Sequence, residues 1–492
     1  MKRVLTLLFA AILLSSTTAC SGRTIIDETQ DTDVPETVPV ETGPLLEKDN
    51  LPERDFGGAK YTMSIADSSY MWDKTFHVME ELTGEGLNDA RYYNIKNTEE
   101  RFNVVIGEVD CGDVWAAPFR AAILSGDTSL HVGYYADFCI LPIVKEGLMQ
   151  ELHTIPNIDL SRVYWNQKFQ EVASVNGKLF FTIGAFETSY IERAHCIIFN
   201  KDLAEQYQLE NLYEAVDNGK WTIDYFAQTM ENVQTDLNGD GTYNMEDRWG
   251  YLSGSKQVLP NFWISGGKQT IKKDDQDIPY YALEGDEVFI DLIDKVFRIM
   301  WDDNNWYVEF ANEDISNNAL AMFAENKGLY MDMNFYSIQS FRDVDVDFGI
   351  LPYPKADENQ AEYLTRIEAA YKGVCVPVTN TGETLDMTGT ILESLYCDAQ
   401  NTIIPAFIDV MLKGKNTRDE ESAGMMDMIL QNMIFDFGDT WWAFIRDQMF
   451  GPMFLNNNRN YGSEFAKIKK QAENSIREVL PVFGVEAETY TE

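Results

Sequence analysis

The chain has 492 residues, which is too long for one ordinary hydrophobic core, so two compact lobes are expected. Hydrophobic residues make up 45% of the sequence and aromatic residues 13%, which is enough to build two cores and leave rings to line a site. The formal net charge of −41 argues against nucleic acid and against electrostatic docking on anionic lipid, because both attract Lys and Arg.

The first residues have the pattern of a secretory signal. A short positive region precedes an uncharged apolar run over 4–14, which is only about half as long as a membrane span. The run leads to Ala19 and Cys20, which resemble a bacterial lipobox, where a small residue precedes a cysteine that receives diacylglycerol. Thr17 stands where that motif usually has Leu, so an ordinary signal peptide is the alternative. We expect a lipoprotein signal peptide over 1–19 and lipidation of Cys20.

Residues 20–56 are rich in Thr, Asp, Glu and Pro and contain no aromatic residue before Phe56. Such a composition buries too little surface to offset the entropy of ordering, so a disordered acidic tether is expected there.

Strand-like and helix-like segments alternate from residue 57 onward. Strands are expected at 61–66, 102–109, 131–135, 196–200, 328–333, 348–351 and 373–376, and helices at 88–101, 114–124, 222–234 and 286–301, with a mostly helical C-terminal region. This alternation predicts βαβ units and parallel sheets in an α/β fold. In such sheets ligands bind at the carboxyl ends of strands, so the residues that follow each strand are the candidates for a site.

The cysteines beyond Cys20 are odd in number, widely scattered and free of any C-x-x-C motif, which leaves a zinc site unsupported. Free buried thiols are expected, with one unassigned disulfide as the alternative, at Cys111, Cys139, Cys196, Cys375 and Cys397.

Several segments occur in a characteristic order. Residues 176–186 read NGKLFFTIGAF, 197–209 read IIFNKDLAEQYQL and 213–226 read YEAVDNGKWTIDYF. Later, 323–337 read FAENKGLYMDMNFYS and 346–360 read VDFGILPYPKADENQ. Together these segments resemble the extracellular solute-binding proteins of family 1, the sugar-binding receptors of ABC importers that include maltose-binding protein.

The resemblance implies a two-lobed periplasmic-binding-protein-like fold of type II, with the ligand cleft between the lobes. The crossings between the lobes would fall near 184–192, near 371–376 and after 412. Lobe one would comprise 57–186 plus 371–412, and lobe two 190–365 plus 415–485.

The function implied by the resemblance is carbohydrate capture without catalysis. The chain would be a monomeric, lipid-anchored protein on the outer face of a bacterial cell membrane that delivers its ligand to the membrane subunits of an ABC importer. Several aromatic clusters favour an oligosaccharide over a monosaccharide. Two alternatives stay open: a secreted glycoside hydrolase, since carboxylates are abundant, and a receptor for a non-sugar solute such as a peptide. No G-x-S-x-G or H-E-x-x-H motif occurs.

A sugar receptor needs flat rings for the apolar sugar faces, and carboxylates, amides or Arg for the hydroxyls. The resemblance places Tyr135 and Asp137 after a lobe-one strand, Trp263 before a Ser-Gly-Gly turn, Phe335 and Tyr336 after an apolar strand, and Trp441 and Trp442 on a late helix. Further candidates are Asp67, Tyr70, Trp72, Glu187 and Asn334. For each ring, packing in the core is an equally good interpretation.

A separate pattern occurs in 236–247, which reads DLNGDGTYNMED. Acidic or amide residues at positions 1, 3 and 5 and a glycine at position 6 match the calcium loop of an EF-hand. The expected ligands are Asp236, Asn238, Asp240, the carbonyl of Thr242 and Asp247. An EF-hand has Glu at position 12, where this chain has Asp247, so a metal-free turn rich in Asp and Asn is the alternative to a structural calcium site.

Overall fold

The computed structural model describes residues 46–66, 76–112, 115–307, 317–341, 344–414 and 417–486. All of them belong to one compact unit that begins at Leu46. Within these ranges, no helix is both long and apolar enough to cross a membrane.

The first sheet has five strands in the order β2-β1-β3-β13-β4. β1 (Ala59–Ile65) pairs in parallel with β2 (Val104–Asp110) and with β3 (Val132–Ala136). β13 (Lys372–Cys375) runs antiparallel to β3, and β4 (Phe181–Thr182) pairs antiparallel with β13. Because β13 lies far along the chain, the backbone returns to this sheet after building the second one.

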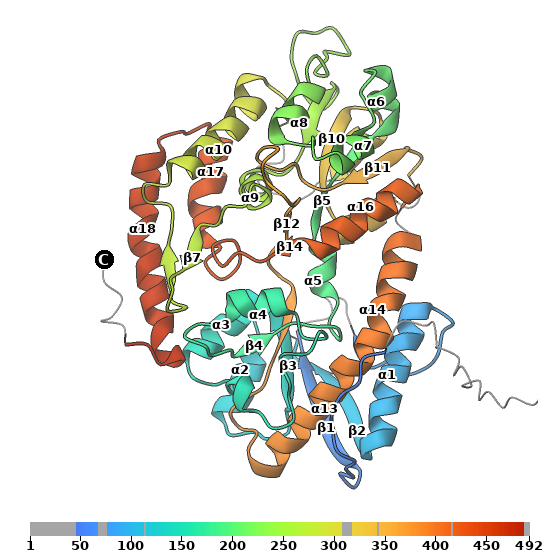
Figure 1. Ribbon diagram of the computed structural model, residues 1–492, viewed down its shortest axis with the longest axis vertical. Helices are drawn as coiled ribbons and strands as arrows, with labels where there is room; N and C mark the ends of the chain where they lie inside the picture. The colour runs from blue at the N-terminus through green and yellow to red at the C-terminus, as the bar shows by residue number, and fades with distance from the viewer. Residues whose placement is uncertain are drawn as a thin grey trace, which may run out of the picture. The chain divides into compact units, whose positions relative to one another are not determined.

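Helices cover the first sheet. α1 (Gly86–Phe102) and α13 (Gly382–Asn401) lie side by side, and the side-chain nitrogen of Asn94 donates to the carbonyl of Leu395 at 3.0 Å (Figure 1). Gly389 of α13 allows a close approach, since a Cβ there would lie 1.9 Å from a backbone carbonyl oxygen. The other elements of this half are α2 (Ala117–Leu124), α3 (Asp137–Lys145), η1 (Leu152–Thr154) and α4 (Gln167–Ala173).

The second sheet has the strand order β11-β5-β10-β6-β9. β10 (Gly328–Asn334) is antiparallel to β5 (His195–Asn200) and parallel to β6 (Trp249–Leu252). β11 (Phe348–Leu351) and β9 (Trp306–Tyr307) form the two edges. Every residue of β5, β10 and β11 is buried, as expected for strands that helices cover on both faces.

Most of the helices around the second sheet begin at side-chain caps. Thr222 accepts a hydrogen bond from the backbone of Tyr225, and Asp286 accepts one from Phe289, so both side chains satisfy free amides of the first turn. These helices are α6 (Lys201–Gln206), α7 (Leu212–Asp217), α8 (Ile223–Thr229), α9 (Ser255–Ser265), α10 (Glu287–Phe297), α11 (Asn317–Ala324), α12 (Phe335–Ile338) and α16 (Glu420–Gln431), with η2 (Arg298–Asp302) and η3 (Gln339–Phe341).

The chain passes between the two sheets in more than one place. One passage contains α5 (Ser189–Glu192), and another runs from β12 (Thr365–Arg366) to β13. A third follows α13 through α14 (Ile403–Pro405) and η4 (Ala406–Lys413) (Figure 1). β12 pairs with β14 (Met433–Ile434) close to the second of these passages.

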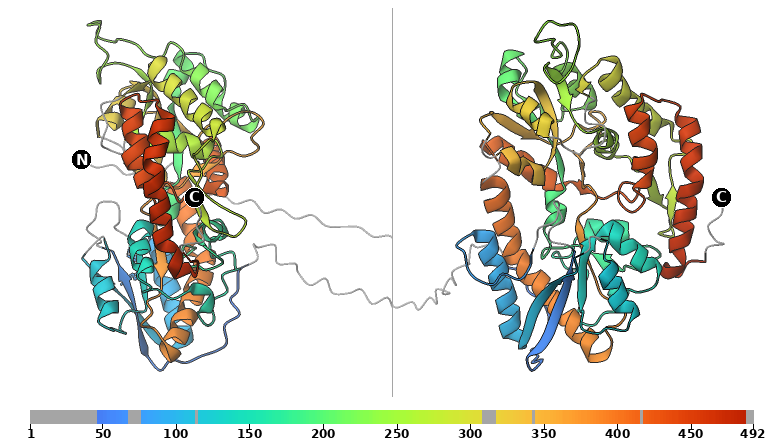
Figure 2. Two further views of the ribbon diagram at one scale, coloured as in Figure 1. Left: turned by 90° about the vertical axis from the view of Figure 1, so that its left-hand side faces the viewer. Right: turned by 180° about the vertical axis from the view of Figure 1, so that it is seen from behind.

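The C-terminal helix contacts both halves of this body. α18 (Tyr461–Val479) packs against β8 (Pro279–Tyr281), which forms a hairpin with β7 (Ile271–Lys273) (Figure 2). Beyond it, in η6 (Leu480–Phe483), the ring of Phe483 lies 5.1 Å from that of Phe180, which precedes β4. Between α16 and α18 lie β14, η5 (Ile445–Phe450) and α17 (Gly451–Leu455).

The expected α/β class is confirmed, and the predicted strands and most predicted helices are present within a few residues. The prediction of a helix over 222–234 is wrong beyond Thr229. The chain turns there, and Asn232 has a φ of 66°, which an α-helix does not accommodate. The short strand β6 and the proline-containing helix α9 were not predicted.

Candidate functional site

The loop 436–442 between β14 and η5 brings together parts of the chain that are far apart in sequence. The indole nitrogen of Trp263 donates to the Asp436 carboxylate at 3.2 Å. The next acid, Asp439, accepts two hydrogen bonds from the Arg366 guanidinium, at 2.5 and 3.0 Å, and one from Arg446 at 2.9 Å. Arg366 lies on β12, so this ion pair fastens the loop to the passage between the two sheets.

A network of polar side chains continues from Arg366 to the carboxyl end of β10. Arg366 also donates to the side-chain oxygen of Gln257, whose nitrogen donates to Glu368 at 2.8 Å. Glu368 also accepts from Asn334 at 3.3 Å and lies 3.3 Å from His195. The predicted candidate Asn334 therefore lies at the end of a strand, as expected, and belongs to a buried network.

Charges inside this network determine its ionisation. Burial disfavours the charged form of Glu368, but the hydrogen bond from His195 and the charges of His195 and Arg366 hold the pKa of Glu368 well below its usual range. Burial also lowers the pKa of His195, yet the carboxylate of Asp332 at 2.9 Å more than compensates and raises that pKa to about 9. At neutral pH the network thus contains an ionised carboxylate beside a protonated imidazole.

The first sheet contributes Asp137, the first residue of α3, directly after β3. Its carboxylate accepts from the backbone of Ala370 at 3.4 Å, and it interacts with the hydroxyls of Tyr371 and Thr440. Burial raises the pKa of Asp137 to about 6, against the lowering effect of these hydrogen bonds. Ala370 has a φ of 77°, a strained conformation for a residue with a side chain, and such strain often occurs at functional sites.

Most of the predicted aromatic residues that the structure describes are packed inside the protein. Trp441 keeps 7% of its surface exposed, and its ring lies 5.3 Å from Phe181 of the first sheet and 4.2 Å from Phe437. The fully buried ring of Trp263 lies 4.7 Å from Phe450. Three other predicted rings, those of Tyr135, Phe335 and Trp442, are also buried.

Two further predicted residues have cationic neighbours. The half-buried ring of Tyr336 lies under the guanidinium of Arg193 at 5.6 Å. Glu187 is fully buried and accepts a 2.7 Å hydrogen bond from His77. Burial opposes ionisation of Glu187, but His77 and Lys372 hold its pKa well below the usual range.

The structure therefore gathers Asp137, Trp263 and Trp441 around the loop 436–442, with Asn334 at the far end of the polar network. Tyr135 belongs to the core of the first sheet, where its hydroxyl lies 2.6 Å from that of Ser64. Asp67, Tyr70, Trp72 and Cys20 lie outside the described residues, and whether any candidate touches a ligand stays a prediction.

Two buried polar atoms without hydrogen-bond partners lie in or against the loop 436–442. Among the described residues, the indole nitrogen of Trp441 and the hydroxyl oxygen of Thr270 are buried and have no hydrogen-bond partner. A Cβ on Gly438 would lie 1.6 Å from that hydroxyl, so the loop packs directly on Thr270. A buried donor without a partner costs about 1–3 kcal/mol, a cost that a ligand or a water molecule removes by accepting the hydrogen bond.

A pocket of about 330 Å³ lies beside the loop. It is bounded by α4, β7 and the segment from β14 to Phe437, and its lining includes Lys168, Glu171, Gln269, Lys272, Phe435 and Phe437. Its size falls in the range of small-molecule sites.

Several residues of the network were not predicted from the sequence: Arg193, His195, Gln257, Arg366, Glu368 and Asp439. One signal could have found two of them. The segment TRIEAAY (365–371) carries two charged residues next to a predicted crossing between the lobes, where the resemblance implies that the ligand binds. The solvent-exposed Trp115 packs edge-on against Phe138 at 5.6 Å; it was expected inside the helix 114–124 and lies just before α2.

The loop 236–247 closes through its own acidic side chains. The two carboxylate oxygens of Asp236 accept from the backbones of Gly239 and Gly241 at 2.6 and 2.8 Å, and Asp240 accepts from Thr242 at 2.7 Å. The buried Asp247 accepts from Leu237 and Asn244, both at 2.9 Å.

The fit of this loop to calcium is partial. The sharp turn at Gly241 that the motif requires is present, with a φ of 78°. The carboxylates bind backbone amides, and the described residues include no group of three or more His, Cys, Asp or Glu side chains placed to hold a metal ion. Calcium binding therefore stays a prediction. All five cysteines within the described ranges are free thiols; four of them are buried, as expected, whereas Cys111 is half-buried.

No protein-family model matches the chain, and no curated protein sequence matches it. Solved structures match its fold. The sugar-binding protein MalE from Xanthomonas citri is 10% identical, with a TM-score of 0.58 over 87% of this chain and 100% of that one. A sugar transporter from Rhizobium etli in an open conformation is 13% identical, with a TM-score of 0.55 over 85% and 99%.

A maltose/maltodextrin-binding domain from Bdellovibrio bacteriovorus bound to maltotriose is 14% identical, with a TM-score of 0.51 over 85% of this chain and 100% of that one. The match extends over nearly the whole described body. The chain thus has the two-lobed α/β fold of the maltose-binding-type solute-binding proteins, as the resemblance of its sequence segments implied.

Proposed function

We propose that the protein is an extracellular substrate-binding lipoprotein that captures a carbohydrate, in particular an oligosaccharide, between its two lobes for import by an ABC transporter. Proteins of the same fold are described as binding maltotriose and maltotetraose. The importer's membrane subunits would be the protein partners, and diacylglycerol on Cys20 would hold the chain at the outer face of the cell membrane.

The observation that carries this proposal is the combination of groups around the loop 436–442. Asp137 comes from the carboxyl end of a first-sheet strand, whereas Asn334 and Glu368 come from the second half. The loop itself contributes the buried indole N–H of Trp441, which has no hydrogen-bond partner. Ionised acceptors, amide donors and an indole donor can pair with the hydroxyls of a neutral sugar. No nucleophile is needed for this task.

A glycan library screened by thermal shift tests the proposal. Ligand bound only to the native state adds about 2.7 kcal/mol at one hundred times its dissociation constant. Unfolding entropy is about 1 kcal/mol/K for a body of roughly 450 residues, so a ligand of this kind should raise the melting temperature by about 3 °C.

Two variants locate the site once a binding sugar is found. Glu368→Gln removes an ionised acceptor, and Trp441→Phe removes the indole N–H while keeping an aromatic ring. Each should weaken sugar binding about tenfold or more by calorimetry, because each leaves a buried polar group of the complex unpaired. Glu358→Gln, at an exposed position, is the matched control and should leave the affinity unchanged. Wild-type affinity in both site variants would refute the location.

The competing glycosidase function is tested on the same samples. Product release from chromogenic glycosides, with turnover lost in a carboxylate variant, would contradict the proposal. Small-angle scattering with and without the binding sugar tests closure, since a hinged cleft that closes lowers the radius of gyration.

A further inference from the structure

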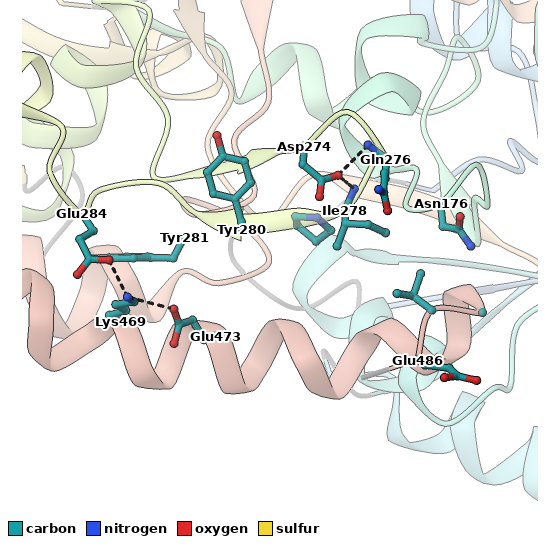
Figure 3. Close-up of a pocket in the computed structure, with 13 residues that line it drawn as sticks. Asn176, Asp274, Gln276, Ile278, Tyr280, Tyr281, Glu284, Lys469, Glu473 and Glu486 are labelled. Carbon is teal, nitrogen blue, oxygen red and sulfur yellow. Dashed lines mark hydrogen bonds and ion pairs between the residues drawn. The ribbon is translucent and has the colours of Figure 1, made fainter. Parts of the chain in front are cut away.

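A second pocket, of about 680 Å³, shares no lining residue with the site around 436–442. It lies between the β7–β8 hairpin and α18 (Figure 3). Its lining runs from Glu284 at one end of the hairpin to Asn176 and Glu486 at the other, which makes the pocket elongated. A volume of this size falls in the range of ligand sites.

Two tyrosines of β8 lie in this pocket in different ways. The ring of Tyr281 is buried, and its hydroxyl donates to the carbonyl of Phe465 at 3.2 Å, so this residue is fixed against α18. Tyr280, its neighbour on the strand, also lines the pocket, but its ring points away from α18 (Figure 3) and keeps 39% of its surface exposed. An aromatic ring held on a short strand and open to solvent offers an apolar face at a small entropic cost.

The polar groups of the pocket are fixed by contacts within its walls. The ammonium of Lys469 lies 2.6 Å from Glu284 and 3.6 Å from Glu473, across the space between hairpin and helix (Figure 3). Asp274 accepts from the backbones of Gln276 and Ile278 at 2.9 and 3.0 Å. Each carboxylate has about four lone-pair positions, so these oxygens keep capacity for further hydrogen bonds.

The charge of the lining restricts the ligand. Lys469 is the lining cation, whereas Asp274, Glu284, Glu473 and Glu486 are acidic. Carboxylates that accept hydrogen bonds suit the hydroxyls of a neutral sugar, while the excess of negative charge repels an acidic one. An elongated pocket suits several linked sugar rings better than a single ring.

We propose that the pocket between the β7–β8 hairpin and α18 is a second saccharide site for a neutral linear oligosaccharide. The carboxylates between hairpin and helix would bind its hydroxyls, and the outward-pointing ring of Tyr280 would contact a sugar face at the edge of the hairpin. This goes beyond the proposed function, whose ligand binds between the lobes. The second site holds sugar at the flank of the protein, independently of the site at 436–442.

Hydrogen exchange followed by mass spectrometry tests this second site on the full chain. The probes are maltotetraose, cellotetraose and xylotetraose at millimolar concentration, with tetragalacturonate as the acidic counterpart. At least one neutral probe should slow exchange in the segments 271–286 and 465–486, and tetragalacturonate should not. In Tyr280→Ala, the same protection should need a sugar concentration about ten times higher, because the variant lacks the aromatic face.

Tyr93→Ala, at another exposed tyrosine, is the matched control and should bind as wild type does. Wild-type protection of the hairpin in Tyr280→Ala would overturn the inference, and so would the absence of protection there with all three neutral probes. The outcomes are separable from those of the proposed function. Glu368→Gln should weaken protection around 366–371 and 436–442 while leaving that of the hairpin unchanged. The reverse pattern in Tyr280→Ala would show that each site binds sugar independently.

Discussion

The buried ion pair between Arg366 and Asp439 offers a quantitative test of what fastens the loop 436–442. Both side chains are completely buried, and two hydrogen bonds join them. Arg366→Met leaves the Asp439 carboxylate buried with Arg446 as its remaining partner at 2.9 Å. Removing one member of a buried pair costs about 3–5 kcal/mol, because the other charge has lost both its partner and its water. The remaining contact with Arg446 places the expected loss near 3 kcal/mol.

That loss can be measured by thermal unfolding. With an unfolding entropy of about 1 kcal/mol/K, Arg366→Met should lower the melting temperature by roughly 3 °C. The control is Arg459→Met, which breaks an equally bidentate pair with Asp302 at the surface, at 2.6 and 3.0 Å. Exposed pairs contribute at most about 1 kcal/mol, so this variant should shift the temperature by 1 °C or less. Equal shifts of the melting temperature in the two variants would refute the argument that burial makes the loss of the Arg366–Asp439 pair more destabilising than the loss of an exposed pair.

Three other predictions concern separate parts of the chain. The pKa of His195 is raised from about 6.5 to about 9, so the contribution of its protonated form to stability is complete below pH 6.5 and is lost as the pH rises to 9. His195→Gln should therefore flatten the fall in unfolding free energy between pH 6.5 and 9. An unchanged pH profile in urea titrations of this variant would contradict the prediction. If the loop 236–247 binds calcium, chelation and Asp240→Ala should each lower the melting temperature and leave the sugar affinity unchanged. Glu358→Ala is the control variant. A melting temperature that does not respond to chelator would show that the calcium site does not exist. Metabolic labelling with a fatty acid should mark the wild type and not Cys20→Ala, and equal labelling of both would exclude Cys20 as the anchor.

The fold was predictable because its strands carry strong local signals. The segments 196–200, 328–333 and 348–351 are mostly apolar, as buried strands require, and each forms a strand of the second sheet. β6 has only four residues, too few for a periodic pattern to appear. α9 contains Pro260, which usually marks the end of a helix, and the helix continues past it because nearly all of its side chains are buried.

The candidate site was predictable only in part, because a sequence shows residue types but not which groups meet. Trp263 was chosen as a ring for a sugar, whereas its indole N–H binds Asp436 and its ring packs on Phe450. Trp263 lies beside the loop 436–442, but its ring is fully buried, and whether it touches a ligand stays a prediction. Arg366 and Glu368 were missed because charged residues near a strand usually face solvent. Both charges can be buried because Arg366 pairs with Asp439, 73 residues further along the chain, and because Arg446 also binds Asp439.

The arrangement of Glu368 explains how such a network can serve recognition. Three side chains, those of His195, Gln257 and Asn334, hold its carboxylate before any ligand arrives. A sugar hydroxyl would then meet an oriented, ionised acceptor, and little conformational entropy would be lost on binding. The supporting residues should therefore matter to affinity even without touching the sugar. Gln257→Ala and Glu368→Gln act on the same carboxylate. The loss of sugar-binding free energy in the double variant should therefore be smaller than the sum of the losses in the two single variants. Additive losses in calorimetry would show that the two side chains act independently.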